Sequence, residues 1–178
     1  IEVIRLKFDL STIKRGKQDK VNLDFTVNFD DINYYGDILK FVAPITVLGE
    51  IYGIGKKIYL SCNINTELEV QCARCLKPFS YFLKTNLSAE LLGDSEISEE
   101  DDLDDILVYS DNIIDFEGII RDQIMTNVPM KALCNENCKG LCKKCGKDIN
   151  LESCLCNLEN DDSIDPRLAK LKELLQQD

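Results

Sequence analysis

The sequence predicts an α+β protein in which an antiparallel β-sheet, either open or curled toward a barrel, is covered by a helix. Apolar and polar residues alternate through most of residues 1–92, which is the period of β-strands. Residues 116–128 instead have the apolar spacing of an amphipathic helix. Six of the nine cysteines then fall within residues 134–156. We therefore expect a sheet domain at 1–130 and a cysteine-rich module with a terminal helix at 131–178.

The expected strands follow from unbroken alternation. Residues 21–29 and 43–53 form two such runs, and the glycines within 53–56 predict a hairpin turn after the second run. Alternation then continues through residues 58–72, which exceeds the usual strand length of about 5–6 residues. We expect one long strand that bends or bulges at 63–65, where β-propensity is weakest.

This long strand places two cysteines. Cys62 lies in its inward-facing phase, so we expect a buried and inert thiol. Cys72 ends the strand and begins a CxxC motif with Cys75, and another alternating run follows at 81–91. The CxxC motif is therefore expected to form the turn between two antiparallel strands, a knuckle that suits a metal ion.

The covering helix at 116–128 has clear predicted ends. Asp115 is a competent N-cap, and Pro129 stops the helix. Before it, eight of the twelve residues from 94 to 105 are acidic, which predicts a solvated loop. A short strand is expected at 106–109.

A terminal helix is expected to begin at Asp165, with Pro166 at its first helical position. Its leucines share one side: Leu168, Leu171, Leu174 and Leu175. Because so short a helix is marginal alone, we expect this side to dock on the sheet domain or on a partner.

Composition restricts the class of protein. The net charge of −11 argues against broad, non-specific binding of nucleic acid. No apolar run approaches the length of about 18 residues that spans a membrane, and the beginning of the sequence lacks the apolar stretch of a signal peptide. We therefore expect a cytoplasmic protein with reduced thiols and no membrane partner. Because histidine is absent, zinc would be held by cysteine, either alone or together with a carboxylate.

Eight cysteines form four close pairs, which suffice for one or two tetrahedral zinc ions. The pairs are Cys72/Cys75, Cys134/Cys138, Cys142/Cys145 and Cys154/Cys156. In the preferred partition the last two pairs bind one ion, and Gly146 lets backbone N–H groups turn toward the sulfurs. The first two pairs then form a second site that ties the sheet to the module. In the alternative partition, the two middle pairs share one ion and the two outer pairs share another.

An all-cysteine ligand set is typical of closed structural zinc and not of catalytic zinc. With no histidine, the sequence predicts neither an enzyme nor a small-molecule substrate. A competing interpretation is a thiol–disulfide oxidoreductase using Cys72 and Cys75, although the strand pattern lacks the βαβ context of such enzymes. The same cysteines are also compatible with a metal buffer or with a zinc-dependent protein-interaction module.

Basic residues gather around the cysteines of this acidic chain. From residue 131 to 148 only Glu136 and Asp148 oppose five lysines. We expect a contact face for a partner that consists of Arg74, Lys139, Lys143, Lys144 and Lys147.

Several stretches of the chain resemble the YceD family, the large ribosomal RNA subunit accumulation proteins. They are CARCLKPF at 72–79, DFEGIIRDQIMTNVP at 115–129, CNENCKGLCKKCGKDINLESCLC at 134–156 and DPRLAKL at 165–171. The resemblance implies a cytoplasmic or plastid factor, not an enzyme, that is needed for synthesis, processing or stability of 23S ribosomal RNA. Its implied partner is large-subunit ribosomal RNA or a ribosomal protein.

The residues that match the family's motif positions include all eight paired cysteines. The others are Arg74, Gly140, Gly146 and Asn150. Two features depart from the pattern: Lys143 stands where many members have proline, and Asp148-Ile149-Asn150 stands where Asn-Leu-Asn is common. Lysine in place of proline makes this part of the module less rigid and more basic.

Overall fold

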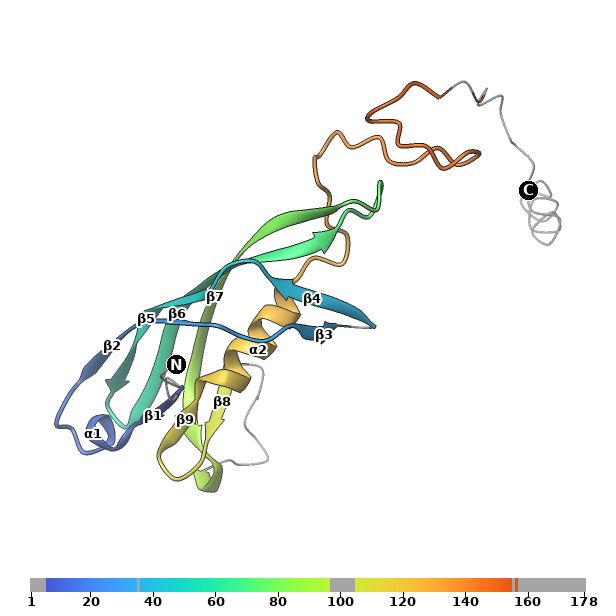
Figure 1. The fold of residues 1–178 in the computed structure, drawn as a ribbon. Helices are drawn as coiled ribbons and strands as arrows, with labels where there is room; N and C mark the ends of the chain where they lie inside the picture. The colour runs from blue at the N-terminus through green and yellow to red at the C-terminus, as the bar shows by residue number, and fades with distance from the viewer. Residues whose placement is uncertain (1–5, 35, 97–104, 155, 157–178) are drawn as a thin grey trace, which may run out of the picture.

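The computed structural model describes residues 6–34, 36–96, 105–154 and 156 (Figure 1). Its strands are β1 (Lys7–Asp9), β2 (Lys20–Val27), β3 (Ile32–Tyr34), β4 (Asp37–Phe41), β5 (Ile45–Ile54), β6 (Lys57–Gln71), β7 (Pro78–Gly93), β8 (Ile106–Tyr109) and β9 (Ile113–Asp115). The helices are α1 (Ser11–Lys14) and α2 (Phe116–Asn127), with a 3-10 turn at Asp94–Glu96. The α+β prediction is confirmed.

The main seven-stranded sheet contains the path β2-β5-β6-β7-β8, with β4 also paired to β6 and β3 paired to β4, and it is open, not a closed barrel. Its neighbours are antiparallel except β7 and β8, which pair in parallel. β5 and β6 form the predicted hairpin, in which Ile54 pairs with Lys57 and Gly55 adopts a φ of +63°. β1 and β9 form a separate two-stranded sheet.

The long strand predicted at 58–72 is confirmed as β6, but of the bend or bulge predicted at Asn63–Asn65 the bulge is wrong. β6 and β7 pair one to one from Ile58 to Gln71 without interruption. Instead of bulging, β6 changes its other neighbour. β5 pairs with it as far as Asn65, and β4 takes over at Leu68. Between these two pairings, the connection from β4 to β5 pairs with β6: the backbone N–H of Val42 donates to the carbonyl oxygen of Glu67 at 2.8 Å.

Helix α2 lies across one face of the sheet and begins and ends where the sequence predicts (Figure 1). The Asp115 side chain accepts a hydrogen bond from the backbone N–H of Glu117 at 3.0 Å, as an N-cap does. The helix buries Phe116, Ile120 and Ile124 against the sheet. Gln123, a polar residue on this apolar face, donates from Nε2 to Thr85 Oγ1 at 2.9 Å, so its amide is satisfied by β7.

The core lies between the inward phases of the strands, α2 and the β1–β9 pair. Its fully buried members include Leu10, Ile45, Ile51, Leu60, Ile64, Leu68, Ile114, Ile120 and Ile124. Cys62 is 3% exposed within this core, which confirms its predicted burial. Among the described residues, no helix has the length and apolar character required to cross a membrane. The terminal helix expected from Asp165, and residues 97–104 of the acidic loop, lie outside the described part of the chain.

Gly49 provides a test of how closely β5 and β6 approach. It pairs with Cys62, and a β-carbon at this position would overlap the carbonyl oxygen of Ser61 and the Cα of Cys62. We expect Gly49→Ala to lower the free energy of unfolding by about 1–3 kcal/mol, as overpacking does. Urea unfolding followed by circular dichroism measures this change.

The matched control is Gly118→Ala in α2, where a β-carbon would meet nothing within 4 Å. The same substitution should there raise stability by up to about 1 kcal/mol, because alanine has the higher helix propensity. Two substitutions with the same sign and size would contradict the close approach at Gly49.

Candidate metal centres

The β6–β7 turn carries Cys72 and Cys75, as the sequence predicts. Gln71 and Pro78 are the last paired residues of the two strands. Within the turn, the Cys72 N–H donates to the Lys77 carbonyl and the Leu76 N–H donates to the Cys72 carbonyl, both at 2.9 Å. These two bonds fold the CxxC motif into a tight knuckle, so both sulfurs face the same side.

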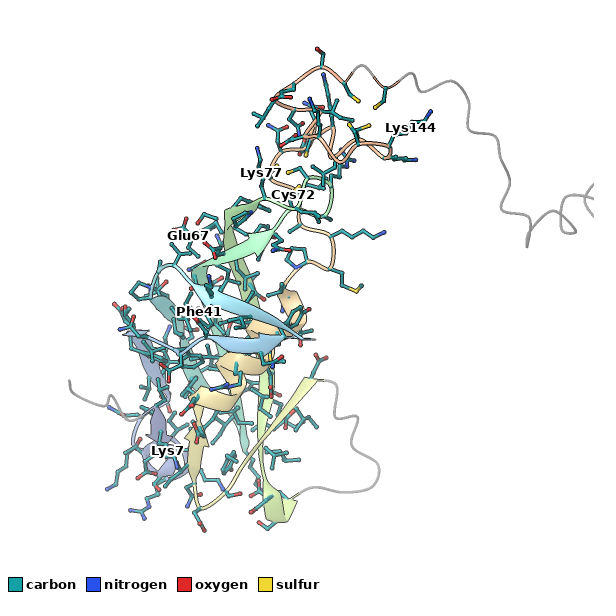
Figure 2. The ribbon with its side chains drawn as sticks, turned by 45° about the vertical axis from the view of Figure 1, so that its right-hand side comes forward. Lys7, Phe41, Glu67, Cys72, Lys77 and Lys144 are labelled. Carbon is teal, nitrogen blue, oxygen red and sulfur yellow. The ribbon has the colours of Figure 1, made fainter. Side chains whose placement is uncertain are left out.

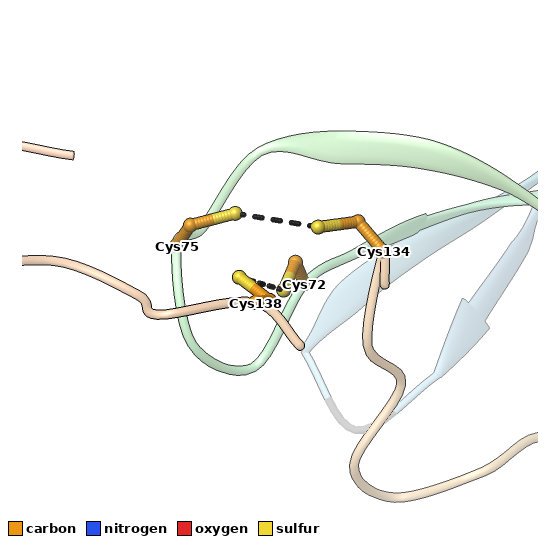
Figure 3. Close-up of side chains that lie close together, drawn as sticks. All are labelled: Cys72, Cys75, Cys134 and Cys138. Carbon is orange, nitrogen blue, oxygen red and sulfur yellow. Dashed lines mark hydrogen bonds between the residues drawn. The ribbon is translucent and has the colours of Figure 1, made fainter. Parts of the chain in front are cut away.

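The chain after α2 brings two more cysteines to this knuckle (Figure 3). The Ala73 N–H donates to the carbonyl of Ala132 at 2.8 Å, which fastens the two segments together. Cys138 Sγ then lies 3.8 Å from Cys72 Sγ, and Cys134 Sγ lies 3.7 Å from Cys75 Sγ. All four sulfurs lie within 4.8 Å of one another, and we call this group the first cluster.

The second cluster consists of Cys142, Cys145, Cys154 and Cys156, whose sulfurs also lie within 4.8 Å of one another. Cys154 Sγ lies 3.3 Å from Cys142 Sγ and 3.5 Å from Cys145 Sγ. The structure therefore brings together the pairs of the preferred partition. In the described residues, no group of potential ligands combines the pairs as the alternative partition does.

The knuckle of the second cluster has the same hydrogen bonds as the first. The Cys142 N–H donates to the Lys147 carbonyl, and the Gly146 N–H donates to the Cys142 carbonyl, both at 2.8 Å. Gly146 has a φ of +71°, as its predicted role requires, whereas Leu76 holds the equivalent place in the first knuckle at +59°. Two copies of one turn therefore present the two CxxC pairs.

Hydrogen bonds and an ion pair join the segments that carry the two clusters. Asn150 Nδ2 donates to Cys138 Sγ at 3.4 Å, while Asn150 Oδ1 accepts from the Lys139 N–H at 2.7 Å. Lys77 Nζ and Asp148 Oδ2 form an ion pair at 2.8 Å. The Leu141 N–H donates to the carbonyl of Arg74 at 3.1 Å. The second cluster is thus attached to the end of the sheet through the residues around the first.

Arg74 has an internal role that the sequence did not indicate. Its Nη1 donates to the carbonyl oxygens of Cys138 at 2.7 Å and Glu136 at 3.2 Å. The guanidinium therefore holds the loop that supplies Cys134 and Cys138 against the knuckle. Because these hydrogen bonds occupy its guanidinium, Arg74 is less available to contact a partner than the predicted contact face requires.

The lysines of the predicted face, Lys139, Lys143, Lys144 and Lys147, are all exposed on the module. Figure 2 shows Lys144 at the end of the molecule that carries Cys72 and Lys77, pointing outward, with Lys7 at the opposite end. Lys147 Nζ pairs with Glu152 at 3.3 Å. A surface pair of this kind is worth little in water and opens easily.

Backbone N–H groups create a favourable setting for thiolates in both clusters. Hydrogen bonds from the backbone of Cys134 and Cys75 lower the pKa of Cys72 to about 6. Those from Cys145 and Lys144 lower the pKa of Cys142 to about 6. By contrast, burial alone raises the pKa of Cys62 to about 11. Cys72 and Cys142 are therefore favoured as thiolates, whereas contacts with neighbouring cysteine sulfurs raise the pKa of Cys134 and that of Cys154 to about 12.

The donor sets fit a tetrahedral zinc ion. Sulfurs about 2.3 Å from such an ion lie about 3.8 Å from one another. The closest contacts in the first cluster are 3.8 and 3.7 Å, and those in the second are 3.5 and 3.3 Å. The first cluster also forms a small packed core of its own with Phe79, Leu133 and Leu141, separate from the main core. Both clusters could hold a metal ion.

Sequence reasoning missed Leu76, Lys77 and the ion-pair role of Asp148. A signal for the first two was present in the chain. CARCLK at 72–77 and CKKCGK at 142–147 align as two copies of one CxxC-x-K pattern. Recognising that repeat would have placed Leu76 opposite Gly146 and Lys77 opposite Lys147. The pairing of Lys77 with Asp148 depends on tertiary structure and has no such signal.

The fold and the clusters define a class: an α+β protein whose sheet end carries two four-cysteine groups suited to structural metal. Residues 60–175 match the family model described as "Large ribosomal RNA subunit accumulation protein YceD". That match spans more than half of the chain and includes both clusters. The chain belongs to the YceD family.

Individual relatives span different shares of the chain. It is 25% identical over 174 residues to a Bacillus subtilis protein named "Uncharacterized protein YlbN", covering 97% of this chain and 98% of the relative. It is 28% identical to each of two proteins named "Large ribosomal RNA subunit accumulation protein YCED homolog 1, chloroplastic". The maize match covers 88% of this chain and 65% of the relative, and the Arabidopsis thaliana match covers 76% and 50%. No solved structure matches the chain significantly.

Gly140 tests how the first cluster is held. It has a φ of +78°, and a β-carbon would lie 2.8 Å from the carbonyl oxygen of Arg74. Alanine in this conformation costs about 1–2 kcal/mol, so Gly140→Ala should open the cluster and speed alkylation of Cys138 about tenfold. Alkylation followed residue by residue with mass spectrometry measures the rate.

Gly36→Ala is the control, because Gly36 has a φ of +94° but a β-carbon there would meet nothing within 4 Å. It strains the backbone of the β3–β4 turn without creating a steric contact and should leave the Cys138 rate unchanged. If Gly140→Ala behaves like this control, the Arg74 contact does not hold the cluster.

Proposed function

We propose that the chain is a non-enzymatic factor that acts in the cytoplasm or plastid and supports synthesis, processing or stability of 23S ribosomal RNA. Two zinc ions would hold its module rigid, and basic residues of the module would contact a partner in the assembling large subunit. The observation that carries the proposal is the family match at residues 60–175. The names of the maize and Arabidopsis relatives support it.

In this proposal the zinc ions have a structural role. Four cysteine sulfurs fill every position of a tetrahedral ion, which leaves none for a substrate. The first ion would be held by Cys72, Cys75, Cys134 and Cys138, and the second by Cys142, Cys145, Cys154 and Cys156. Asn150, which donates to Cys138 Sγ, would orient a ligand of the first ion. Residues 131–178 are then a module that depends on metal, attached to a sheet domain at 1–130 that does not.

Charge indicates how the module would meet its partner. On a chain of net charge −11, the exposed Lys139, Lys143, Lys144 and Lys147 are gathered on one small unit. A narrow RNA contact or a ribosomal protein suits such a surface better than RNA wrapped around the molecule. Arg74 would support this surface from within, because it holds the loop that leads to Lys139.

Counting metal ions tests the structural role of the clusters. We expect two zinc ions per chain by native mass spectrometry, one after Cys142→Ser, and two after Cys62→Ser, since Cys62 belongs to the main core. Structural zinc contributes about 10–16 kcal/mol in small modules, so chelation should unfold the module while the sheet remains.

A different result at the first cluster would favour another function. If Cys72→Ser retains both ions, and Cys72 and Cys75 of the native chain cycle reversibly through a disulfide, the thiol–disulfide oxidoreductase becomes the better interpretation. Metal that exchanges readily and leaves without unfolding the module would instead favour a metal buffer.

The proposed contact face is tested by charge reversal. Lys139→Glu together with Lys143→Glu should reduce association with large-subunit precursor particles at least tenfold, because two attractive contacts become repulsive. Co-sedimentation of the tagged chain with particles from gradient-fractionated extract measures association.

The matched control is Lys17→Glu with Lys56→Glu, which makes the same change in net charge on exposed residues at the α1 and β5–β6 end of the molecule. This pair should leave association unchanged. Equal loss in both double variants would indicate a general charge effect, and no loss in either would rule out the face.

A further inference from the structure

Leu76 occupies a costly backbone position. Its φ is +59°, in the left-handed region that leucine rarely adopts, whereas the equivalent place in the second knuckle is Gly146 at +71°. The two turns have the same hydrogen bonds, so glycine would satisfy the geometry at position 76 as well. The strain therefore arises from the leucine side chain and not from the turn.

Contacts of the leucine side chain do not offset this strain within the described residues. Leu76 is 59% exposed and belongs to neither the main core nor the small core of the first cluster. Backbone strain without a compensating internal contact is typical of binding surfaces. The strained and exposed Leu76 therefore marks a candidate binding surface.

Leu76 lines a groove of about 490 Å³ beside the first cluster, together with two other apolar side chains that face solvent. Met130 is 95% exposed and Ile38 is 64% exposed. Val128 and Pro129, at the end of α2, form part of the wall. An apolar groove of this kind accepts the apolar side of an amphipathic helix, with anchors spaced three, four or seven residues apart.

The chain contains a segment with this spacing. Leu168, Leu171, Leu174 and Leu175 follow Asp165 and Pro166, which are favourable residues for a helix start. A helix so short is marginal in water and becomes stable when its apolar side is packed. Its leucines therefore need a surface such as the groove.

Length and charge favour docking within the same chain. About a dozen residues separate Cys156 from Leu168, and when extended they span up to about 40 Å, more than the diameter of about 30 Å of a small domain. The connecting residues 157–165 include Glu159, Asp161, Asp162 and Asp165 and no basic residue. Their negative charge is opposite to that of the lysine-rich module to which they are joined in sequence.

We propose that the groove beside the first knuckle is the docking site of the chain's own leucine segment at 165–178, with Leu76 as the anchor that the segment covers. This inference is independent of the ribosomal function. One contact would then account for the strained Leu76, the exposed Met130 and the leucine-rich side of the segment.

A single tryptophan tests the docking, because the chain contains none. In the chain carrying Leu171→Trp, the tryptophan emission should be blue-shifted relative to the same chain that also carries Leu76→Gly and Met130→Ser. Acrylamide quenching should be several-fold weaker in the first variant than in the second. Leu76→Gly removes the anchor but suits the backbone, as Gly146 shows, so lost shielding would not be due to a disrupted knuckle. Leu168→Trp is a second reporter in case tryptophan at 171 itself prevents docking.

Phe82→Ser is the control, since Phe82 is 65% exposed on the opposite face of β7 from the core and does not line the groove. It should leave emission and quenching unchanged. Tryptophans that are equally quenched in all backgrounds, at both positions, would overturn the proposal. Shielding that increases with protein concentration would also overturn it, because the segment would then bind a second copy.

Discussion

The contact between the β6–β7 turn and the chain that follows α2 is the constraint on which both cysteine clusters and the attachment of the module depend. The sheet domain is stabilised by an apolar core of ordinary kind, but the module beyond residue 131 adds little to that core. Its attachment includes sulfurs facing sulfurs, a guanidinium on two carbonyls, one ion pair and backbone hydrogen bonds. Each of these polar contacts has its partner on the other segment, so neither segment alone would satisfy them.

The two parts of the molecule therefore obey different physical rules. In the sheet domain, burial of branched aliphatic side chains on β5, β6 and α2 provides the stability. This hydrophobic interaction is non-directional, so it does not require atoms at fixed distances. In the module, a few polar atoms must meet at fixed distances, and thiolates that are not paired with a cation would repel one another. This difference explains why the cysteine spacing is the more specific feature of the sequence.

Local features of the fold were predictable, and long-range features were not. The alternation of β6, the Asp115 cap and the burial of Cys62 are all set by residues close in sequence, and the structure confirms them. The parallel pairing of β7 with β8 and the change of neighbour along β6 depend on where distant strands arrive, which no local pattern records. The same reason applies to the sites. Spacing identified the eight clustered cysteines, whereas the carbonyl partners of Arg74 became visible only when the loop was placed beside the knuckle.

The two clusters differ in how far along the chain their members lie, which implies an order of assembly. Cys142 and Cys154 are 12 residues apart, whereas Cys72 and Cys138 are 66 apart. Closing the longer loop from an unfolded chain costs about 1.5 kcal/mol more in entropy. The second cluster can therefore close early and locally, but the first can close only after β6, β7 and α2 have brought its halves together. An ion captured there would mark a chain whose sheet has already folded.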